Sequence, residues 1–219
     1  GESIKSNAEY DNGVTTHSES YPERYAVLLD SNVGNDVSMD SSDTITHEIP
    51  MLSLAKAYTM GDVQSYITRT VKAGATGFRL QPKLDGMSLS AVYTNGGLSS
   101  LSSRGNGEVG RNLTYLIGNP DVTINGLPMR IDSRGSVEVR GELLLRHSDF
   151  TIASKARENA TGTPFETYRN ANAGIVNGAR LGLGYHATLT FVSYRLIING
   201  VPHDDEPSEL DDMGFTSAA

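Results

Sequence analysis

The stretch from Met87 to Ser103, MSLSAVYTNGGLSSLSS, decides the fold expected for this chain of 219 residues. Apolar residues recur at alternate positions from Met87 to Tyr93, and Leu98 and Leu101 follow the turn sequence Thr94-Asn95-Gly96-Gly97. A period of two is typical of a strand with one buried face, and Asn-Gly between two such runs is a strong hairpin signal. The stretch therefore predicts paired antiparallel strands at residues 87–93 and 98–103.

Segments on both sides of this hairpin extend the prediction to a mixed fold. By the same periodicity we expect further strands at residues 77–85 and 137–145, and the mostly apolar run at residues 191–198 predicts a buried strand. Helical spacing and capping residues predict helices that begin at Asp62, after Ser148 as N-cap, and near residues 171–176. The acidic stretch at the end is expected to be irregular. The whole indicates an α+β fold, an antiparallel sheet with peripheral helices.

Charge and composition divide the chain into an arm and a folded domain. Residues 1–44 are polar and acidic and are expected to form an N-terminal arm or linker, with the folded domain at 45–219. The net charge is -8, but residues 76–180 hold twelve Lys or Arg against nine Asp or Glu. Solvated mixed charge is the ordinary explanation of such a segment, although it also permits contact with phosphates.

Several classes of protein are excluded by composition. There is no cysteine, so disulfides and cysteine-ligated zinc are ruled out and an intracellular, cytoplasmic location is permitted. No apolar run approaches the length of a membrane span, and no signal peptide opens the chain at Gly1. We therefore expect no membrane partner.

Lys83-Leu84-Asp85-Gly86 is the segment that indicates chemistry. A lysine that attacks phosphorus must be neutral, and nearby positive charge and desolvation favour the neutral amine. Asp85 is expected to share the strand face of Lys83 and to orient its amine, and Gly86 to let the backbone approach a nucleotide. The competing explanation is an exposed lysine beside a turn.

Two later segments strengthen the hypothesis. In Ser103-Arg104-Gly105-Asn106-Gly107-Glu108-Val109-Gly110 the glycines would free backbone N–H groups for a phosphate, and Arg104 adds a forked donor. A plain glycine-rich hairpin loop is the alternative. In Val139-Arg140-Gly141-Glu142 the glutamate would accept from a ribose hydroxyl or help hold a metal, unless it forms a salt bridge with Arg140.

These segments, in order, resemble one family: the adenylation domain of NAD-dependent DNA ligases. The resemblance covers roughly residues 46–215 and rests on six motifs. They are His-Glu-Ile-Pro-Met-Leu-Ser-Leu (47–54), Gln-Pro-Lys-Leu-Asp-Gly (81–86), Ser-Arg-Gly-Asn-Gly (103–107), Val-Arg-Gly-Glu (139–142), Arg-Asn-Ala-Asn-Ala-Gly (169–174) and Phe-Val-Ser-Tyr (191–194).

The resemblance implies an antiparallel-sheet nucleotidyltransferase fold, the ATP-grasp-like ligase adenylation fold, and roles for individual residues. Lys83 would become the lysyl-AMP nucleophile, with NAD and magnesium as cofactors and nicked duplex DNA as the partner. The remaining implied contacts are Ser53 and Leu54 against adenosine, Gln81 at adenine, Arg104 and Glu142 at the nucleotide, and Arg169 at DNA phosphates, with Arg180 as a substitute for an arginine missing at Asn177.

The chain also departs from the family pattern. Gln81 replaces a glutamate, Asn106 an aspartate, and Arg111-Asn112-Leu113-Thr114 an acidic Glu-Asp-Val-Thr. No Asp-Gly-Val-Val-x-Lys motif follows Tyr194, so the domain is expected to be incomplete at its C-terminal end. A second ligase subunit that supplies the later lysines would reconcile these facts. The alternatives are a non-catalytic ligase-like binding subunit and an ATP-using polynucleotide ligase.

Overall fold

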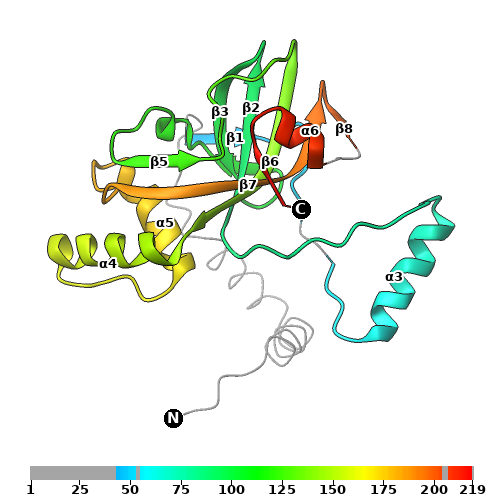
Figure 1. Ribbon diagram of the computed structural model, residues 1–219, viewed down its shortest axis with the longest axis horizontal. Coiled ribbons are helices and arrows are strands. Elements are labelled where there is room, and N and C mark those ends of the chain that lie inside the picture. Colours follow the sequence, from blue (N-terminus) through cyan, green and yellow to red (C-terminus); the bar gives the residue numbers. More distant parts are fainter. Residues whose placement is uncertain (1–42, 53–54, 204–206, 219) are drawn as a thin grey trace, which may run out of the picture. The chain divides into compact units, whose positions relative to one another are not determined.

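The structure, a computed structural model, describes residues 43–52, 55–203 and 207–218 (Figure 1). Its described residues fall into two compact units. The first contains residues 52 and 55–79, and the second contains residues 43–51, 80–203 and 207–218. Nearly all of the predicted arm, together with Ser53 and Leu54, lies outside the described residues. The arm and its boundary therefore remain predictions.

Helix α3, Met60–Lys72, is the regular element of the first unit. The Thr59 hydroxyl accepts from the backbone N–H of Asp62 at 3.1 Å, and the Asp62 carboxylate accepts from that of Thr59 at 2.8 Å. This reciprocal capping box satisfies two donors that the first helical turn leaves unpaired. The predicted helix is confirmed, and it begins two residues before Asp62.

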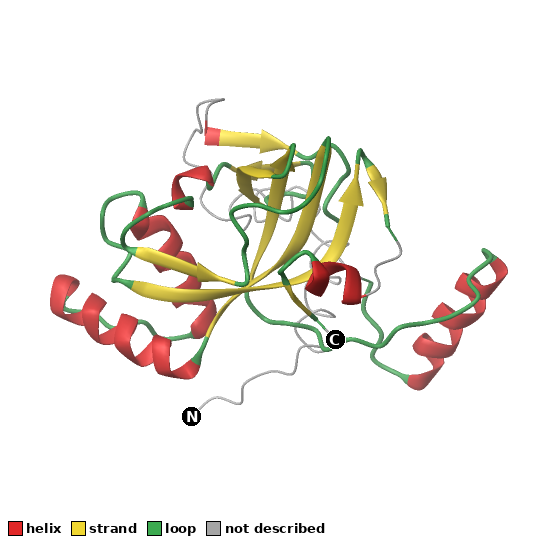
Figure 2. Cartoon of the chain, turned by 45° about the horizontal axis from the view of Figure 1, so that its top comes forward, coloured by secondary structure: helices red, strands yellow, loops and turns green. Residues whose placement is uncertain are grey.

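A seven-stranded sheet forms the second unit (Figure 2). Its main path has the order β3-β2-β6-β7-β5, and every pairing along it is antiparallel except that of β5 with β7. The strands are β2 (Met87–Thr94), β3 (Gly97–Ser103), β5 (Val122–Asn125), β6 (Ser136–Leu145), β7 (Ala187–Ile198), β8 (Val201–Pro202) and β9 (Thr216–Ser217). Strands β1 (Thr44–Thr46) and β4 (Val109–Arg111) form a separate antiparallel pair.

The hairpin between β2 and β3 forms as predicted. Asn95 has a φ of 48° and Gly96 a φ of 79°, so both central residues of the turn are left-handed. Such a turn matches the twist of paired strands, and Asn and Gly are the residues that tolerate it. A Cβ atom on Gly96 would also lie 2.5 Å from the carbonyl oxygen of Ile131, so this position requires glycine.

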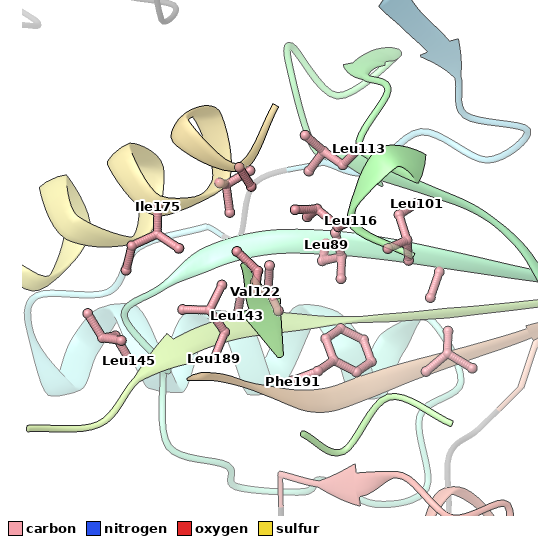
Figure 3. Packing of buried hydrophobic residues seen from close by; sticks show 14 of the residues in the cluster. Leu89, Leu101, Leu113, Leu116, Val122, Leu143, Leu145, Ile175, Leu189 and Phe191 are labelled. Carbon is pink, nitrogen blue, oxygen red and sulfur yellow. The ribbon is translucent and has the colours of Figure 1, made fainter. Parts of the chain in front are cut away.

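Helices cover the sheet and complete one hydrophobic core. They are the 3-10 helix η2 (Thr114–Leu116) and the α-helices α4 (His147–Thr161), α5 (Tyr168–Ala179) and α6 (Pro207–Asp212). Ile175 of α5 packs over Leu143, Leu145 and Leu189 of the sheet (Figure 3). The predicted second helix is thus confirmed as α5, capped by Thr167, whose hydroxyl accepts from the Asn170 N–H at 3.1 Å.

Three predictions about secondary structure are wrong. Residues 75–86 form no strand; Pro82 has no N–H to donate, and the strand begins only at Met87. Ser148 does not cap α4, because the helix begins at His147 and Arg146 holds the N-cap position without a side-chain hydrogen bond. The acidic tail is not wholly irregular: it forms α6 and β9, because Leu210 and Phe215 insert into the core.

Candidate functional site

Glu142 on β6 is the centre of the candidate site. The pairing of β2 with β6 places Ser88 opposite Glu142, and the Ser88 hydroxyl donates to its Oε1 at 2.5 Å. Burial raises the pKa of Glu142, whereas the Ser88 hydrogen bond and the positive charges of Lys83 and Arg104 lower it. Three residues predicted to bind one nucleotide therefore lie near enough to interact electrostatically.

Lys83 is exposed in the irregular segment that leads into β2. The path of this segment is fixed by Gly86, where a Cβ atom would lie 2.2 Å from the carbonyl oxygen of Leu143. Glycine is therefore required so that the chain can pass closely over β6. This packing against β6 is the reason that the structure gives for Gly86, and the expected approach of a nucleotide to its backbone stays a prediction.

Asp85 does not share a strand face with Lys83, because the predicted strand is absent. Its carboxylate instead forms an ion pair with Arg169 of α5, and both side chains are exposed. The negative charge of Asp85 still acts on Glu142, whose pKa it raises. Asp85 thus joins Arg169, the residue predicted to approach DNA, to the segment that carries Lys83.

Gln81 is the remaining predicted contact on this segment. Its side-chain Nε2 donates to the carbonyl oxygen of Ala218 at 2.5 Å. Ala218 follows β9, which pairs in parallel with β7. The end of the described chain therefore fixes the orientation of the Gln81 amide.

The glycine-rich loop differs from its prediction. The Oδ1 atom of Asn106 accepts from the N–H groups of Glu108 at 2.9 Å and Val109 at 2.8 Å, and the Gly107 N–H donates to the Arg104 carbonyl at 3.0 Å. These amides bond within the loop, so the expectation that they face a phosphate is wrong for them. Asn106 acts here as the acceptor that closes the turn, a role open to aspartate as well.

Arg140 does not pair with Glu142, so that alternative is also wrong. Its guanidinium binds Glu138 in a bidentate ion pair, with 2.7 Å between Nε and Oε1 and 3.2 Å between Nη2 and Oε2. Both side chains are buried, and the Ser90 hydroxyl also donates to Glu138 at 2.7 Å. Glu142 is left with Ser88 as its hydrogen-bonded side chain.

Tyr194 belongs to the site although no role was predicted for it. In the pairing of β6 with β7, Arg140 faces Arg195 and Gly141 faces Ser193, so Tyr194 is the extra residue of a bulge. Burial together with the charge of Glu142 raises the pKa of Tyr194 to about 12, although the interaction of Tyr194 with Ser88 lowers it. Tyr194 therefore stays a neutral donor at physiological pH. Its motif was visible in the sequence, but the bulge that aims the side chain was not.

The second predicted DNA contact, Arg180, lies at the end of α5. It forms an ion pair with Asp43 at 2.6 Å. Nearby, Arg111 of β4 donates to the side-chain oxygen of Asn177 at 2.8 Å. An arginine thus lies beside Asn177, but it is Arg111 of β4. Arg111 occupies a position at which the family pattern has a glutamate.

Three further observations concern the described residues outside this site. A cavity of about 360 Å³ lies apart from Lys83, lined by Arg157, Thr161, Phe165, Asn170, Ala173, Gly174, Asn177 and Tyr185. No group of three His, Asp or Glu side chains able to hold a metal occurs in the described part of the chain. Within the same residues, no helix is both long and apolar enough to cross a bilayer.

Comparison with known proteins identifies similar chains. Residues 39–216 match the family described as the NAD-dependent DNA ligase adenylation domain. A DNA ligase of Campylobacter hominis is 32% identical over 174 residues, which is 78% of this chain and 26% of that protein. The protein named DNA ligase 2 of Streptomyces coelicolor is 31% identical over 188 residues, or 84% of this chain and 26% of that protein.

A third relative, a DNA ligase of Methylorubrum extorquens, is 36% identical over 160 residues, or 68% of this chain and 19% of that protein. The chain thus spans about a quarter or less of the length of these relatives. The similarity covers the segments that carry Lys83, Arg104 and Glu142.

The Ser88 hydrogen bond makes a prediction about protonation. Replacing Ser88→Ala removes one of the interactions that lower the pKa of Glu142, so that pKa should rise further above its ordinary value. Carbon-detected NMR titration of the carboxyl group measures it, with Glu142→Gln for assignment. Ser99→Ala, an exposed serine on β3, is the control and should leave it unchanged. An unchanged or lower pKa in Ser88→Ala would contradict the geometry.

Proposed function

The chain belongs to the family of NAD-dependent DNA ligase adenylation domains, and we propose that Lys83 is its nucleophile for AMP. One observation carries this proposal. Lys83, Arg104 and Glu142 come from three separate segments, yet the charges of the first two act on the carboxylate of the third. A lysine amine, a forked donor and a hydrogen-bond acceptor that interact with one another fit a nucleotide better than an exposed lysine beside a turn.

The proposed step is a substitution at phosphorus. The neutral Nζ of Lys83 attacks the adenylyl phosphorus of NAD, and a P–N bond forms. The P–O bond to nicotinamide mononucleotide breaks, its electron pair leaves with that phosphate oxygen, and the amine loses a proton to solvent. Arg104 provides charged donors for the phosphate oxygens, whose negative charge grows in the transition state.

Recognition of the nucleoside is assigned to the other residues of the site. Glu142 accepts from a ribose hydroxyl, and the neutral Tyr194 hydroxyl fixes the Ser88–Glu142 pair beside it. Gln81 contacts adenine through the amide that Ala218 orients. Ser53 and Leu54 are proposed to lie against the adenosine.

Magnesium is proposed to enter with the nucleotide phosphates. The described residues offer no three-carboxylate or histidine cage. Magnesium commonly binds through substrate phosphates and one or two carboxylates, and Glu142 and Asp85 lie near enough to act on each other. Bound there, the ion would neutralise phosphate charge.

Sealing of nicks in duplex DNA is the proposed activity of the whole protein. We assign Arg169 and Arg180 to DNA phosphates, which would replace their present partners Asp85 and Asp43. We also propose that the sheet is the core of an ATP-grasp-like nucleotidyltransferase fold. The later phosphate-binding lysines would come from outside these 219 residues, on a continuation of the chain or on a second subunit.

Our first functional prediction concerns the isolated chain. Incubated with NAD and magnesium, it should gain one AMP slowly, because two lysine donors are absent from it and each typically contributes roughly 10²–10³ in rate. Intact-protein mass spectrometry measures the gain. Lys83→Ala should abolish it, whereas Lys155→Ala, an exposed lysine of α4, should not.

The same assay separates the alternatives. Faster labelling by ATP than by NAD would favour the ATP-using ligase. Rapid labelling by NAD would refute the need for further lysines while supporting Lys83 as the nucleophile. Absence of labelling even when the later lysines are restored, on a longer chain or a second polypeptide, would favour a non-catalytic subunit.

A second prediction concerns DNA. Arg169→Ala should weaken binding of nicked duplex DNA and reduce the slope of log affinity against log salt by about 1, the value for one lost phosphate contact. Fluorescence anisotropy across a salt series measures both quantities. Arg134→Ala, an exposed arginine in the loop before β6, is the control. If Arg169→Ala and Arg134→Ala lost the same affinity for nicked DNA, the proposed contact of Arg169 with a DNA phosphate would be wrong.

A further inference from the structure

The segment His47–Met51 runs beside the glycine-rich loop without forming a strand there. The backbone N–H of His47 donates to the Glu108 carbonyl at 2.8 Å, and that of Met51 donates to the Gly107 carbonyl at 2.7 Å. The segment continues β1, which pairs with β4. It is therefore attached along the loop that presents Arg104.

The His47 side chain adds a second attachment to this loop. His47 is 8% exposed, and the Nε2 atom of its ring lies 3.1 Å from the carbonyl oxygen of Ser103 and 3.2 Å from that of Arg104. Both partners are acceptors only, so Nε2 must carry a hydrogen. A Cβ atom on Gly110 would lie 3.0 Å from Nε2, so the ring occupies space that glycine leaves open. His47 thus holds the peptide group of Arg104 itself.

The opposite side of the segment is bound to β6. The buried Arg140 donates from Nη1 to the Pro50 carbonyl at 3.1 Å and from Nη2 to the Ile49 carbonyl at 2.5 Å. Its position is fixed by the bidentate pair with Glu138. Because a guanidinium is planar, its donors hold these two carbonyl groups in a defined geometry. Arg140 is two residues before Glu142 on the same strand.

We propose that His47 and Arg140 are positioning residues that set where Arg104 stands relative to Glu142. The segment His47–Met51 is the bridge: His47 fixes the loop that carries Arg104, and Arg140 fixes the bridge to the strand that carries Glu142. This inference rests on the proposed nucleotide-binding role of Arg104 and Glu142. Neither positioning residue needs to touch the nucleotide.

If His47 only filled space, any side chain of similar volume could replace it. If it positions Arg104, the replacement must place an N–H donor where the histidine Nε2 lies. Glutamine can place its Nε2 near the site of the histidine Nε2. Asparagine is shorter and places its nitrogen near the site of Nδ1. His47→Gln and His47→Asn are therefore matched amides that differ in whether the two carbonyl groups keep their donor.

The experiment measures the dissociation constant of NAD for the full 219-residue chain by titration calorimetry. His47→Asn should weaken binding by about tenfold, on the scale of one lost hydrogen bond, and His47→Gln by less than about threefold. In an Arg104→Ala background the effect of His47→Asn should disappear, because the residue acts through Arg104. Amide exchange over residues 104–110 should be faster in His47→Asn and unchanged in His47→Gln.

A second variant keeps the test independent of how His47→Asn folds. Arg140→Lys retains a charge for Glu138 but loses the fork on Ile49 and Pro50, so NAD binding should weaken in the same way. Arg195→Lys, the exposed residue opposite Arg140 on β7, is the control and should bind as the unaltered chain does.

The outcomes distinguish this inference from the function on which it rests. Failure of the unaltered chain to bind NAD would overturn the proposed function, and loop exchange would still decide whether His47 holds the loop. Equal binding by the unaltered chain and His47→Asn would overturn the inference alone. An equal loss in both amide variants, or a loss that persists in Arg104→Ala, would also overturn it.

Discussion

The register between β2 and β6 is the constraint on which the site depends. Antiparallel pairing from Met87 opposite Leu143 to Thr94 opposite Ser136 places Ser88 beside Glu142. A slip of one residue would turn every side chain of one strand to the other face. The register is held by apolar residues of the same ladder, since Leu89, Ala91, Val139 and Leu143 are fully buried. Gly86 then lets the Lys83 segment cross β6 at the level of Leu143.

The polar face of this ladder combines a structural ion pair with Glu142, the carboxylate proposed to bind the nucleotide. Glu138 and Arg140 satisfy each other in the interior, which a buried charge requires. Glu142 accepts from the Ser88 hydroxyl instead of a buried cation, and burial raises its pKa. A carboxyl group with a raised pKa binds its proton more tightly in the folded state, so its charged form destabilises that state as pH rises above the ordinary value of 4.5. Such a cost is common where a group is kept for binding or catalysis.

Much of the sheet was predictable because period-two patterns mark strands with one buried face. Strands β2 and β6 follow them, Asn95-Gly96 marks the turn into β3, and β7 was predicted from its run of mostly apolar residues. Prediction from the sequence failed where the pairing of strands far apart along the chain decides the structure. Ser88 joins the site because strand pairing places it opposite Glu142, and Tyr194 joins it because a bulge in β7 directs its side chain there. The glycine-rich loop shows the same limit, because the side chain of Asn106 takes the amides expected to face a ligand. The family was recognisable because its motifs occur in the expected order along the chain, even where the local structure of a motif was predicted wrongly.

Lys83, Arg104 and Glu142 are proposed to bind one adenine nucleotide together. A crystal structure of the chain with AMP tests it most directly. We expect the phosphate to lie between the Lys83 amine and the Arg104 guanidinium, with a ribose hydroxyl donating to Glu142. AMP bound instead in the cavity beside Arg157 and Asn177, with no contact to Lys83 or Glu142, would contradict it.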